Sequence, residues 1–193
     1  MSIDQIWIDK LAPLVQRDHF IREALMARGI LEDAYHAEME KVHLENAKKL
    51  KVMINQNGFP VLSNAGFEGV QLSWLIINHS IPDPDFMKEC LLEIRMAAAQ
   101  GDYPKDLLAY LEDRVAYFEG KPQLYGTNFD WVEGELKPTK IEDLKLLDTR
   151  RLEYGLPPMA ETLFKISQTP PPKDPEKKQK EFDLWLKKVG WRI

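Results

Sequence analysis

The 193-residue sequence has a single cysteine, Cys90, which excludes an intrachain disulfide. Low cysteine usage of this kind is typical of a reducing compartment. The longest apolar runs, such as residues 74–77, are far shorter than the roughly 20 residues that span a bilayer. The first ten residues lack a basic start followed by an apolar run, so we expect no secretory signal. These absences predict a soluble, cytoplasmic protein with no transmembrane segment.

The familiar signatures of catalysis and nucleotide binding are also missing. The sequence has no glycine-rich phosphate loop, no HExxH helix, no GxSxG elbow and no CxxC pair. The net charge of −5 argues against nucleic acid as a partner. We therefore predict no cofactor and no nucleic-acid partner, and the reaction class stays open.

What the sequence does contain is a helical pattern divided by glycine and proline. Apolar residues recur at helical spacing in segments 13–28, 32–55, 68–79, 84–100 and 104–120. Two shorter helices are predicted at 141–154 and 157–165. Aromatic and β-branched residues at 123–132, followed by Glu133 and Gly134, predict a small β-hairpin near residues 123–138. The predicted fold is mainly α, a compact bundle of about six to seven helices with one hairpin.

One globular domain is expected over residues 1–166. Residues 167–180 hold several prolines and charges with almost nothing apolar, which is typical of a linker. Residues 181–193 then place Phe182, Trp185, Leu186 and Val189 at helical spacing. This amphipathic segment is expected to dock on the domain as a terminal helix. The alternative is a recognition helix for a protein partner or a membrane surface.

One metal-ligand pattern occurs early in the chain. His36, Glu40 and His43 have spacings of four and three, which place them on one helix face. Imidazole and carboxylate groups are good ligands for zinc-type cations. A solvated helix face explains the spacing equally well, so we predict no metal site.

His79 and Asp83 are the candidate catalytic residues. His79 continues the apolar stripe of its helix and lies near the helix C-terminus, where a cationic imidazole is favoured. Asp83 follows shortly afterwards, and a His–Asp pair is the minimal arrangement for a general base. The alternative is a core histidine held by hydrogen bonds, with Asp83 only capping the next helix.

Helix 104–120 carries a polar face beside its apolar stripe. That face contains Asp106, Tyr110, Asp113 and Tyr117 at spacings of four, three and four. Arg114 lies at the edge of the apolar stripe, where a partly buried guanidinium needs a carboxylate or an anionic ligand. The alternative is a structural network of arginine and aspartate.

The loop at 123–128 is a second polar element. Gly126 permits a backbone conformation or a close approach that other residues resist. Tyr125, Thr127 and Asn128 present hydroxyl and amide groups beside it. Such a loop binds a small polar ligand or ties the hairpin to the helices, and the sequence leaves both interpretations open.

The motif LAYLEDRV at 108–115, followed by GKPQLYGT at 120–127, resembles a widespread bacterial family of uncharacterised proteins, a domain of unknown function. The resemblance covers about residues 42–163 and implies a fold rather than an activity. Four positions depart from the family pattern, and Ile81 matters most because it removes a carboxylate near His79. The other departures are His43, Met87 and Asn128. Further matching positions are Asn46, Gly66, Trp74, His79, Asp83, Pro84, Phe86, Asp148, Arg150, Arg151 and residues 141–143 and 155–157.

These features predict a site for a small polar or anionic ligand, because guanidinium groups suit carboxylate and phosphate. The first alternative is a non-catalytic interaction module, whose polar residues form a structural network and whose residues 181–193 bind a protein partner. The second is a hydrolase or group-transfer enzyme with His79 as the base and Asp83 as its orienter. The predicted ligand site is formed by His79, Arg114, Tyr125 and Arg151, with Asp113, Gln123 and Thr127 as further ligand-binding candidates.

Overall fold

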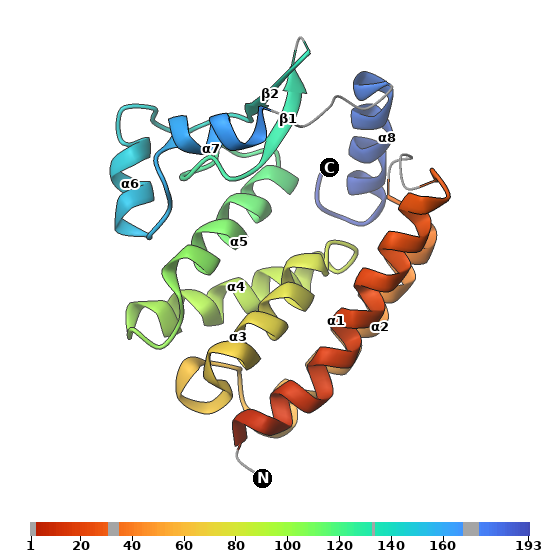
Figure 1. Cartoon of the computed structure of the whole chain (residues 1–193), viewed down its shortest axis with the longest axis vertical. Coiled ribbons are helices and arrows are strands. Elements are labelled where there is room, and N and C mark those ends of the chain that lie inside the picture. The colour runs from red at the N-terminus through yellow and green to blue at the C-terminus, as the bar shows by residue number, and fades with distance from the viewer. Residues whose placement is uncertain (1–2, 31–34, 133, 168–173) are drawn as a thin grey trace.

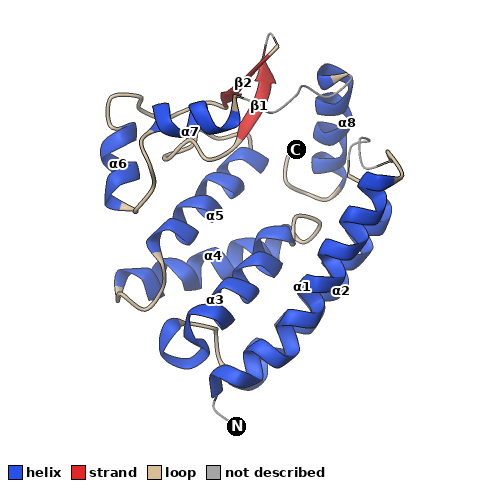
Figure 2. Ribbon diagram, viewed as in Figure 1, coloured by secondary structure: helices blue, strands red, loops and turns tan. Residues whose placement is uncertain are grey.

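The computed structural model describes residues 3–30, 35–132, 134–167 and 174–193. Within these ranges the chain forms eight α-helices and one two-stranded sheet (Figures 1 and 2). The predicted mainly α fold with a small hairpin is confirmed. No helix in the described ranges is long and apolar enough to cross a membrane. The elements are α1 (Ile3–Ala27), α2 (Ala37–Asn57), α3 (Leu62–His79), α4 (Pro84–Ala99), α5 (Lys105–Phe118), β1 (Phe129–Val132), β2 (Glu135–Pro138), α6 (Leu147–Glu153), α7 (Met159–Ile166) and α8 (Pro175–Lys188).

The first helix is longer than its apolar pattern predicts. We expected it over residues 13–28, whereas α1 begins at Ile3 and continues through Pro13. A proline inside a helix costs about 3 kcal/mol because it removes a backbone hydrogen bond and crowds the preceding turn. Trp7 and Leu11 are fully buried in the core, so packing of the turns before Pro13 offsets that cost.

Helix α1 lies along α2 and packs extensively on α3 (Figure 1). Close approach is possible because α3 carries Gly69, where an added Cβ would meet the Cβ of Trp7 at 3.1 Å. Helix α3 also begins earlier than predicted, at Leu62, and it bends at Gly66, whose φ of 63° few other residues adopt. These contacts bring the middle of α1 beside the C-terminal end of α3.

The hairpin, α6 and α7 lie together beside α5 (Figure 1). Strands β1 and β2 pair antiparallel, from Phe129 opposite Pro138 to Val132 opposite Glu135. They occupy only the second half of the predicted hairpin, because Gln123 instead forms an isolated bridge with Ile141. That bridge holds residues 141–146 outside a helix, so α6 begins at Leu147 rather than at 141.

The C-terminal segment docks on the domain. Helix α8 begins at Pro175, where the Asp174 side chain accepts a hydrogen bond from the Lys177 amide at 2.9 Å. The end of the predicted linker is therefore helical, while residues 168–173 of that linker lie outside the described residues. Trp185 is buried, and the indole of the buried Trp191 donates to the Ile81 carbonyl at 2.7 Å. The apolar stripe of residues 181–193 thus packs against its own domain.

Docking of α8 predicts unequal effects for two leucines of the same helix. Leu186 is 0% exposed and Leu184 is 67% exposed. Leu186→Ala should lower the free energy of unfolding by about 2–5 kcal/mol, because it leaves a cavity. Leu184→Ala, the control, should change it by less than about 0.5 kcal/mol. Urea denaturation followed by tryptophan fluorescence measures both, and equal effects would contradict the docking of α8.

Candidate functional site

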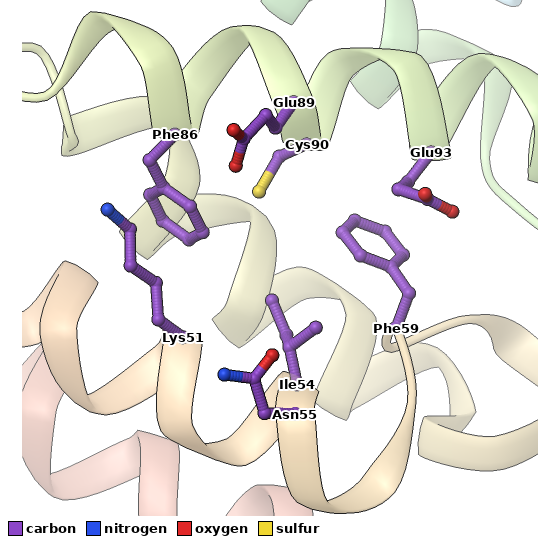
Figure 3. Close-up of a pocket in the computed structure, with 8 residues that line it drawn as sticks. All are labelled: Lys51, Ile54, Asn55, Phe59, Phe86, Glu89, Cys90 and Glu93. Carbon is purple, nitrogen blue, oxygen red and sulfur yellow. The ribbon is translucent and has the colours of Figure 1, made fainter.

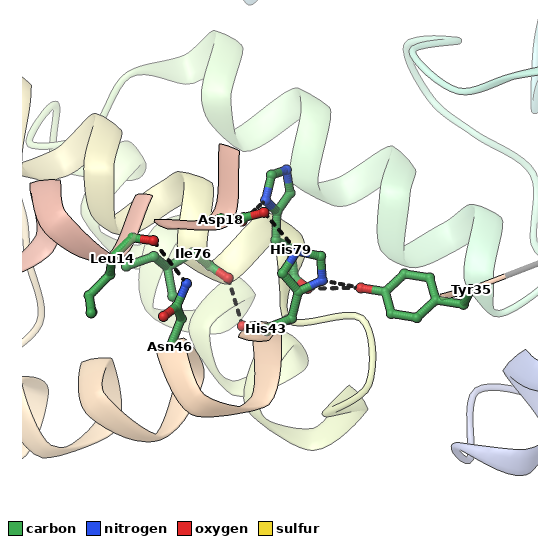
Figure 4. A network of polar contacts seen from close by, with 8 residues as sticks. Leu14, Asp18, Tyr35, His43, Asn46, Ile76 and His79 are labelled. Atoms are coloured by element: carbon green, nitrogen blue, oxygen red, sulfur yellow. Dashed lines mark hydrogen bonds and ion pairs between the residues drawn. The ribbon is translucent and has the colours of Figure 1, made fainter. Parts of the chain in front are cut away.

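A buried carboxylate of α1 lies between two imidazoles from neighbouring helices (Figure 4). Asp18 Oδ1 is 3.2 Å from Nε2 of His43 on α2. Asp18 Oδ2 is 2.7 Å from Nδ1 of His79, the last residue of α3. Three helices therefore meet at one ionisable cluster, and one possible ligand atom from each of its three residues lies within 4.8 Å of the others.

Tyr35 extends this cluster toward α8. Its hydroxyl forms a short hydrogen bond with Nδ1 of His43 and lies 3.5 Å from the His79 carbonyl oxygen. The tyrosine ring stacks on Trp185, with centroids 4.0 Å apart. The indole of Trp185 in turn donates to Glu40 at 3.0 Å. The C-terminal helix thus covers the tyrosine that contacts both histidines.

Exposure and pKa differ among the three residues. The side chains of Asp18 and His43 are 6% and 7% exposed, whereas that of His79 is 23% exposed, so solvent reaches the cluster at His79. Burial acts to raise the pKa of Asp18, but the hydrogen bonds and charges of His43 and His79 outweigh it and hold that pKa well below its usual range. Burial lowers the pKa of His79, although Asp18 opposes the shift. A neutral His79 beside an ionised Asp18 follows at neutral pH.

Arg114 of α5 provides the cationic side of the site. Its Nε is buried without a hydrogen-bond partner, and no carboxylate in the described part of the chain forms an ion pair with its guanidinium. The guanidinium carbon lies 5.2 Å from the Phe118 ring centroid. Arg114 interacts electrostatically with His79 and Tyr35, and it is repelled by Arg22. Burial lowers the pKa of Arg114, because the charged guanidinium is less stable away from water than in it.

Arg22 brings a second positive charge from α1. It follows Asp18 by four residues, so both side chains lie on the same helix face. Arg22 is exposed, and it makes no ion pair with a described residue. Arg114 therefore lies near His79, Arg22 lies near Arg114, and neither guanidinium has an acidic partner among the described residues. The cluster can bind an anion, and its Asp–His pair can move a proton.

The structure corrects the predicted partner of His79. Asp83 was expected to orient this imidazole, but its side chain caps α4 by accepting from the Phe86 amide at 3.3 Å. Its other oxygen accepts from Lys51 at 2.6 Å. Asp18, which lies 61 residues earlier in the chain, occupies the orienting position instead.

The pattern of His36, Glu40 and His43 does not form one site. His36 caps α2, where its Nδ1 accepts from the Glu38 amide at 3.2 Å. Glu40 accepts from Trp185, and only His43 faces the cluster. The sequence-based prediction of no metal site therefore concerned His36, Glu40 and His43, whereas the residues that lie together in the structure are Asp18, His43 and His79.

Most of the other predicted ligand-binding residues form hydrogen bonds with other groups of the chain. Asp113 is fully buried and accepts from the amides of Leu124, Tyr125 and Thr127 at 2.8–3.1 Å. The Thr127 hydroxyl donates to the same carboxylate at 3.0 Å. Gln123 Nε2 donates to the Asn128 carbonyl at 2.9 Å, and its Oε1 accepts from the Asn128 amide at 2.8 Å. These groups hold the loop 123–128 on α5.

Arg151 and Tyr125 belong to the same framework. Arg151 is 2% exposed and donates to the carbonyls of Tyr125 and Pro157 and to the Thr162 hydroxyl, at 2.6–2.7 Å. The Tyr125 hydroxyl donates to Glu112 at 3.1 Å. Gly126 completes this loop with a φ of 64° in the left-handed region. The structure thus brings Arg114 toward His79 but directs Tyr125 and Arg151 into the loop framework.

Sequence reasoning missed Asp18 and Tyr35. A signal for Asp18 existed, because it lies on the apolar stripe of α1 that includes Leu14, Ile21 and Leu25. A carboxylate in such a stripe must be paired when it is buried. Tyr35 precedes α2, and nothing in its sequence context points to the histidines.

A separate pocket of about 420 Å³ lies between α2 and α4 (Figure 3). Its ammonium group, Lys51, is already paired with Asp83. Burial raises the pKa of Cys90 in its wall, so the thiol stays protonated and unreactive. Its carboxylates, Glu89 and Glu93, are exposed. This pocket offers no unpartnered buried charge, whereas Arg114 has a buried Nε without a partner.

The framework role of Arg151 predicts a large effect on stability. Arg151→Gln should lower the free energy of unfolding by more than about 2 kcal/mol, because buried carbonyls lose their donors at about 1–3 kcal/mol each. Arg150→Gln is the matched control, since Arg150 makes only a 3.6 Å ion pair with the exposed Glu142, worth less than about 1 kcal/mol. Chemical denaturation compares them. An Arg151→Gln protein as stable as the control would refute the framework role.

Comparison with known proteins identifies the family of the chain but assigns it no activity. A family model described as a family of unknown function matches residues 9–169, which include Asp18, His43, His79 and Arg114. No curated protein and no solved structure gives a significant match. The chain belongs to the family of unknown function DUF6624.

Proposed function

We propose that the protein binds a small anion, a phosphate or carboxylate group, between Arg114, Arg22 and His79. The observation that carries this proposal is the partly buried guanidinium of Arg114, which has a buried Nε without an acceptor and no carboxylate partner among the described residues. Burying a charge away from water is unfavourable unless an opposite charge pairs with it. A bound anion would supply that opposite charge to Arg114 and lower the free energy of the folded protein.

The chemistry of the surrounding groups favours an anion over a neutral ligand. A guanidinium presents a planar fork of donors that matches two oxygens of carboxylate or phosphate. Arg22 adds a second positive charge. His79 is partly exposed, and its Nε2 has no hydrogen-bond partner among the described residues, so it can contact the same ligand. The Phe118 ring, whose centroid lies 5.2 Å from the guanidinium carbon, adds a cation–π contact that orients Arg114.

The proposal is narrower than the site predicted from sequence. It keeps His79 and Arg114 and leaves out Tyr125 and Arg151, because the described polar contacts of those two residues are made within the loop framework. Asp113, Gln123 and Thr127 are left out for the same reason. In their place the proposal adds Asp18, which forms a hydrogen bond with the His79 imidazole, and Tyr35, whose hydroxyl lies 3.5 Å from the His79 carbonyl oxygen.

Acid–base chemistry on the bound anion is a second candidate function. Asp18 lies 2.7 Å from Nδ1 of His79, which is the geometry that fixes one tautomer and leaves Nε2 as the base. The lowered pKa of His79, caused first by burial, keeps that nitrogen unprotonated near neutral pH. A hydrolase or group-transfer enzyme with His79 as base and Asp18 as its orienter would use this pair.

A protein partner for residues 181–193 is the remaining alternative. Because Trp185 and Leu186 are buried against the domain, such a partner would contact the opposite face of α8, where Leu184 is exposed. Under this alternative the cluster around Asp18 is a structural network. A cytoplasmic location remains a prediction from composition.

Anion binding predicts a specific loss in one arginine variant. At constant ionic strength, inorganic phosphate or malonate should stabilise the protein, by about 2.7 kcal/mol when the ligand is at 100 times its Kd. Arg114→Gln should abolish this stabilisation without lowering the stability of the unliganded protein, because it removes a charge that lacks a partner. Arg95→Gln, the matched control, alters an exposed arginine paired with Glu112 and should keep the response.

The thermal unfolding midpoint, measured across an anion series, distinguishes the alternatives. If neither anion stabilises the wild-type protein, the proposal is wrong. If Arg114→Gln lowers stability by several kcal/mol instead, Arg114 belongs to a structural network that breaks when one member is removed.

The acid–base candidate predicts a rate effect in any hydrolytic or group-transfer activity found with a panel of phosphate and carboxylate esters. His79→Ala should reduce kcat by about 10²–10⁴, the usual contribution of a positioned general base. His19→Ala is the control, because His19 is exposed and next to Asp18 in sequence but outside the cluster. An activity that His79→Ala leaves unchanged would exclude His79 as the base.

A further inference from the structure

We infer that Asp18, His43 and His79 form a binding site for one divalent transition-metal ion of the zinc or iron(II) class, placed so that the anion of the proposed function becomes a ligand of that metal. The inference rests on the proposed function for the identity of the anion, and on the cluster alone for the metal.

The donor set and its geometry carry the inference. Two imidazole nitrogens and one carboxylate oxygen are the protein ligands of many catalytic metal sites that keep a position open. In a tetrahedral zinc site, ligand atoms lie about 3.3 Å from one another, given zinc–nitrogen distances near 2.0 Å. Asp18 Oδ1 lies 3.2 Å from Nε2 of His43, Asp18 Oδ2 lies 2.7 Å from Nδ1 of His79, and one possible ligand atom from each of the three residues lies within 4.8 Å of the others. The three side chains come from three helices, which fixes them before any ion binds.

Tyr35 supplies the outer contact that metal-binding histidines usually have. When a metal takes Nε2 of His43, the proton of that imidazole resides on Nδ1, which then donates to the Tyr35 oxygen. The Tyr35 hydroxyl is then free to donate to the His79 carbonyl, 3.5 Å away. In the metal-free protein Tyr35 donates to Nδ1 and His43 donates to Asp18. Both states satisfy the Tyr35 hydroxyl and both ring nitrogens of His43, and they differ by one hydroxyl rotation and one tautomer.

The surrounding charges favour a cation at the cluster when an anion is also present. Asp18 is a buried carboxylate, and His79 ends α3, where helix carbonyls give a negative partial charge. Arg114 and Arg22 oppose a cation, but a phosphate or carboxylate between them and the metal reverses that effect. Metal and anion should therefore strengthen each other's binding, by a factor of at least about five in each direction.

The chemistry of the ligands selects the metal. Imidazole nitrogens suit zinc, iron and similar cations, whereas magnesium and calcium prefer oxygen ligands. A metal on Nδ1 of His79 places the remaining proton on Nε2, on the far side of the ring from the metal, so His79 does not act as a base and the anion is held by the metal and the arginines. The metal site therefore keeps the anion proposal and replaces the acid–base candidate.

The test uses the full chain after dialysis against a chelator. Zn²⁺ is titrated by calorimetry, with Mg²⁺ as the control cation, and Co²⁺ is used as a spectroscopic probe. We expect one Zn²⁺ per chain, and intense visible bands from Co²⁺ in a nitrogen and oxygen site. His79→Gln should remove both signals, while the matched control His19→Gln should keep both. Tyr35→Phe should weaken Zn²⁺ binding by about 10–100-fold, as loss of an outer contact does.

The outcomes separate the two proposals. No Zn²⁺ binding, or equal binding by His79→Gln, would overturn the metal site even if phosphate still stabilised the wild-type protein through Arg114. Zn²⁺ binding lost in His79→Gln but without any phosphate response would support the metal site and refute the anion. Because His79 is partly exposed, His79→Gln is expected to fold, and circular dichroism of the variant checks this. If it does not fold, the Co²⁺ spectrum of the wild-type protein still decides, since a spectrum without nitrogen ligands would contradict the site.

Discussion

The pairing of the Asp18 carboxylate is the interaction around which the first three helices are arranged. A buried charge without partners is strongly unfavourable, so both carboxylate oxygens must be met by donors. His43 and His79 meet them, and this requirement brings α2 and the end of α3 to the same point of α1. Tyr35 extends the contact to Trp185 of α8. A polar cluster therefore links the N-terminal helices to the C-terminal helix.

Asp113 and Arg151 are buried charges, Arg114 is a partly buried one, and the three differ in how they are paired. Asp113 accepts from backbone amides of the loop that follows α5, and Arg151 donates to backbone carbonyls. Both charges are satisfied by the chain itself. Arg114 follows Asp113 directly but faces another side of α5, and its buried Nε has no partner. The unpartnered Nε of Arg114 is the feature on which the proposed anion site rests.

Local patterns predicted the elements better than the site. Asp83 and Pro84 marked the start of α4, and Gly126 marked a left-handed turn, because these features depend on neighbouring residues alone. The extension of α1 through Pro13 depends on burial of Trp7, which local propensity does not report. His79 and Arg114 were identifiable as polar groups on apolar faces. Their neighbour Asp18 was not, because a contact across 61 residues depends on how α1 packs on α3. The same limit explains why Asp83, near in sequence, was expected beside His79.

We propose that Arg114 and His79 bind an anion beside the Asp18 cluster. A crystal structure of the full chain grown with inorganic phosphate and Zn²⁺ tests it most directly. We expect a phosphate oxygen within hydrogen-bond distance of Arg114 Nε and a metal ion bound by Asp18, His43 and His79. A phosphate absent from Arg114, with that guanidinium paired to a carboxylate of its own chain, would contradict it.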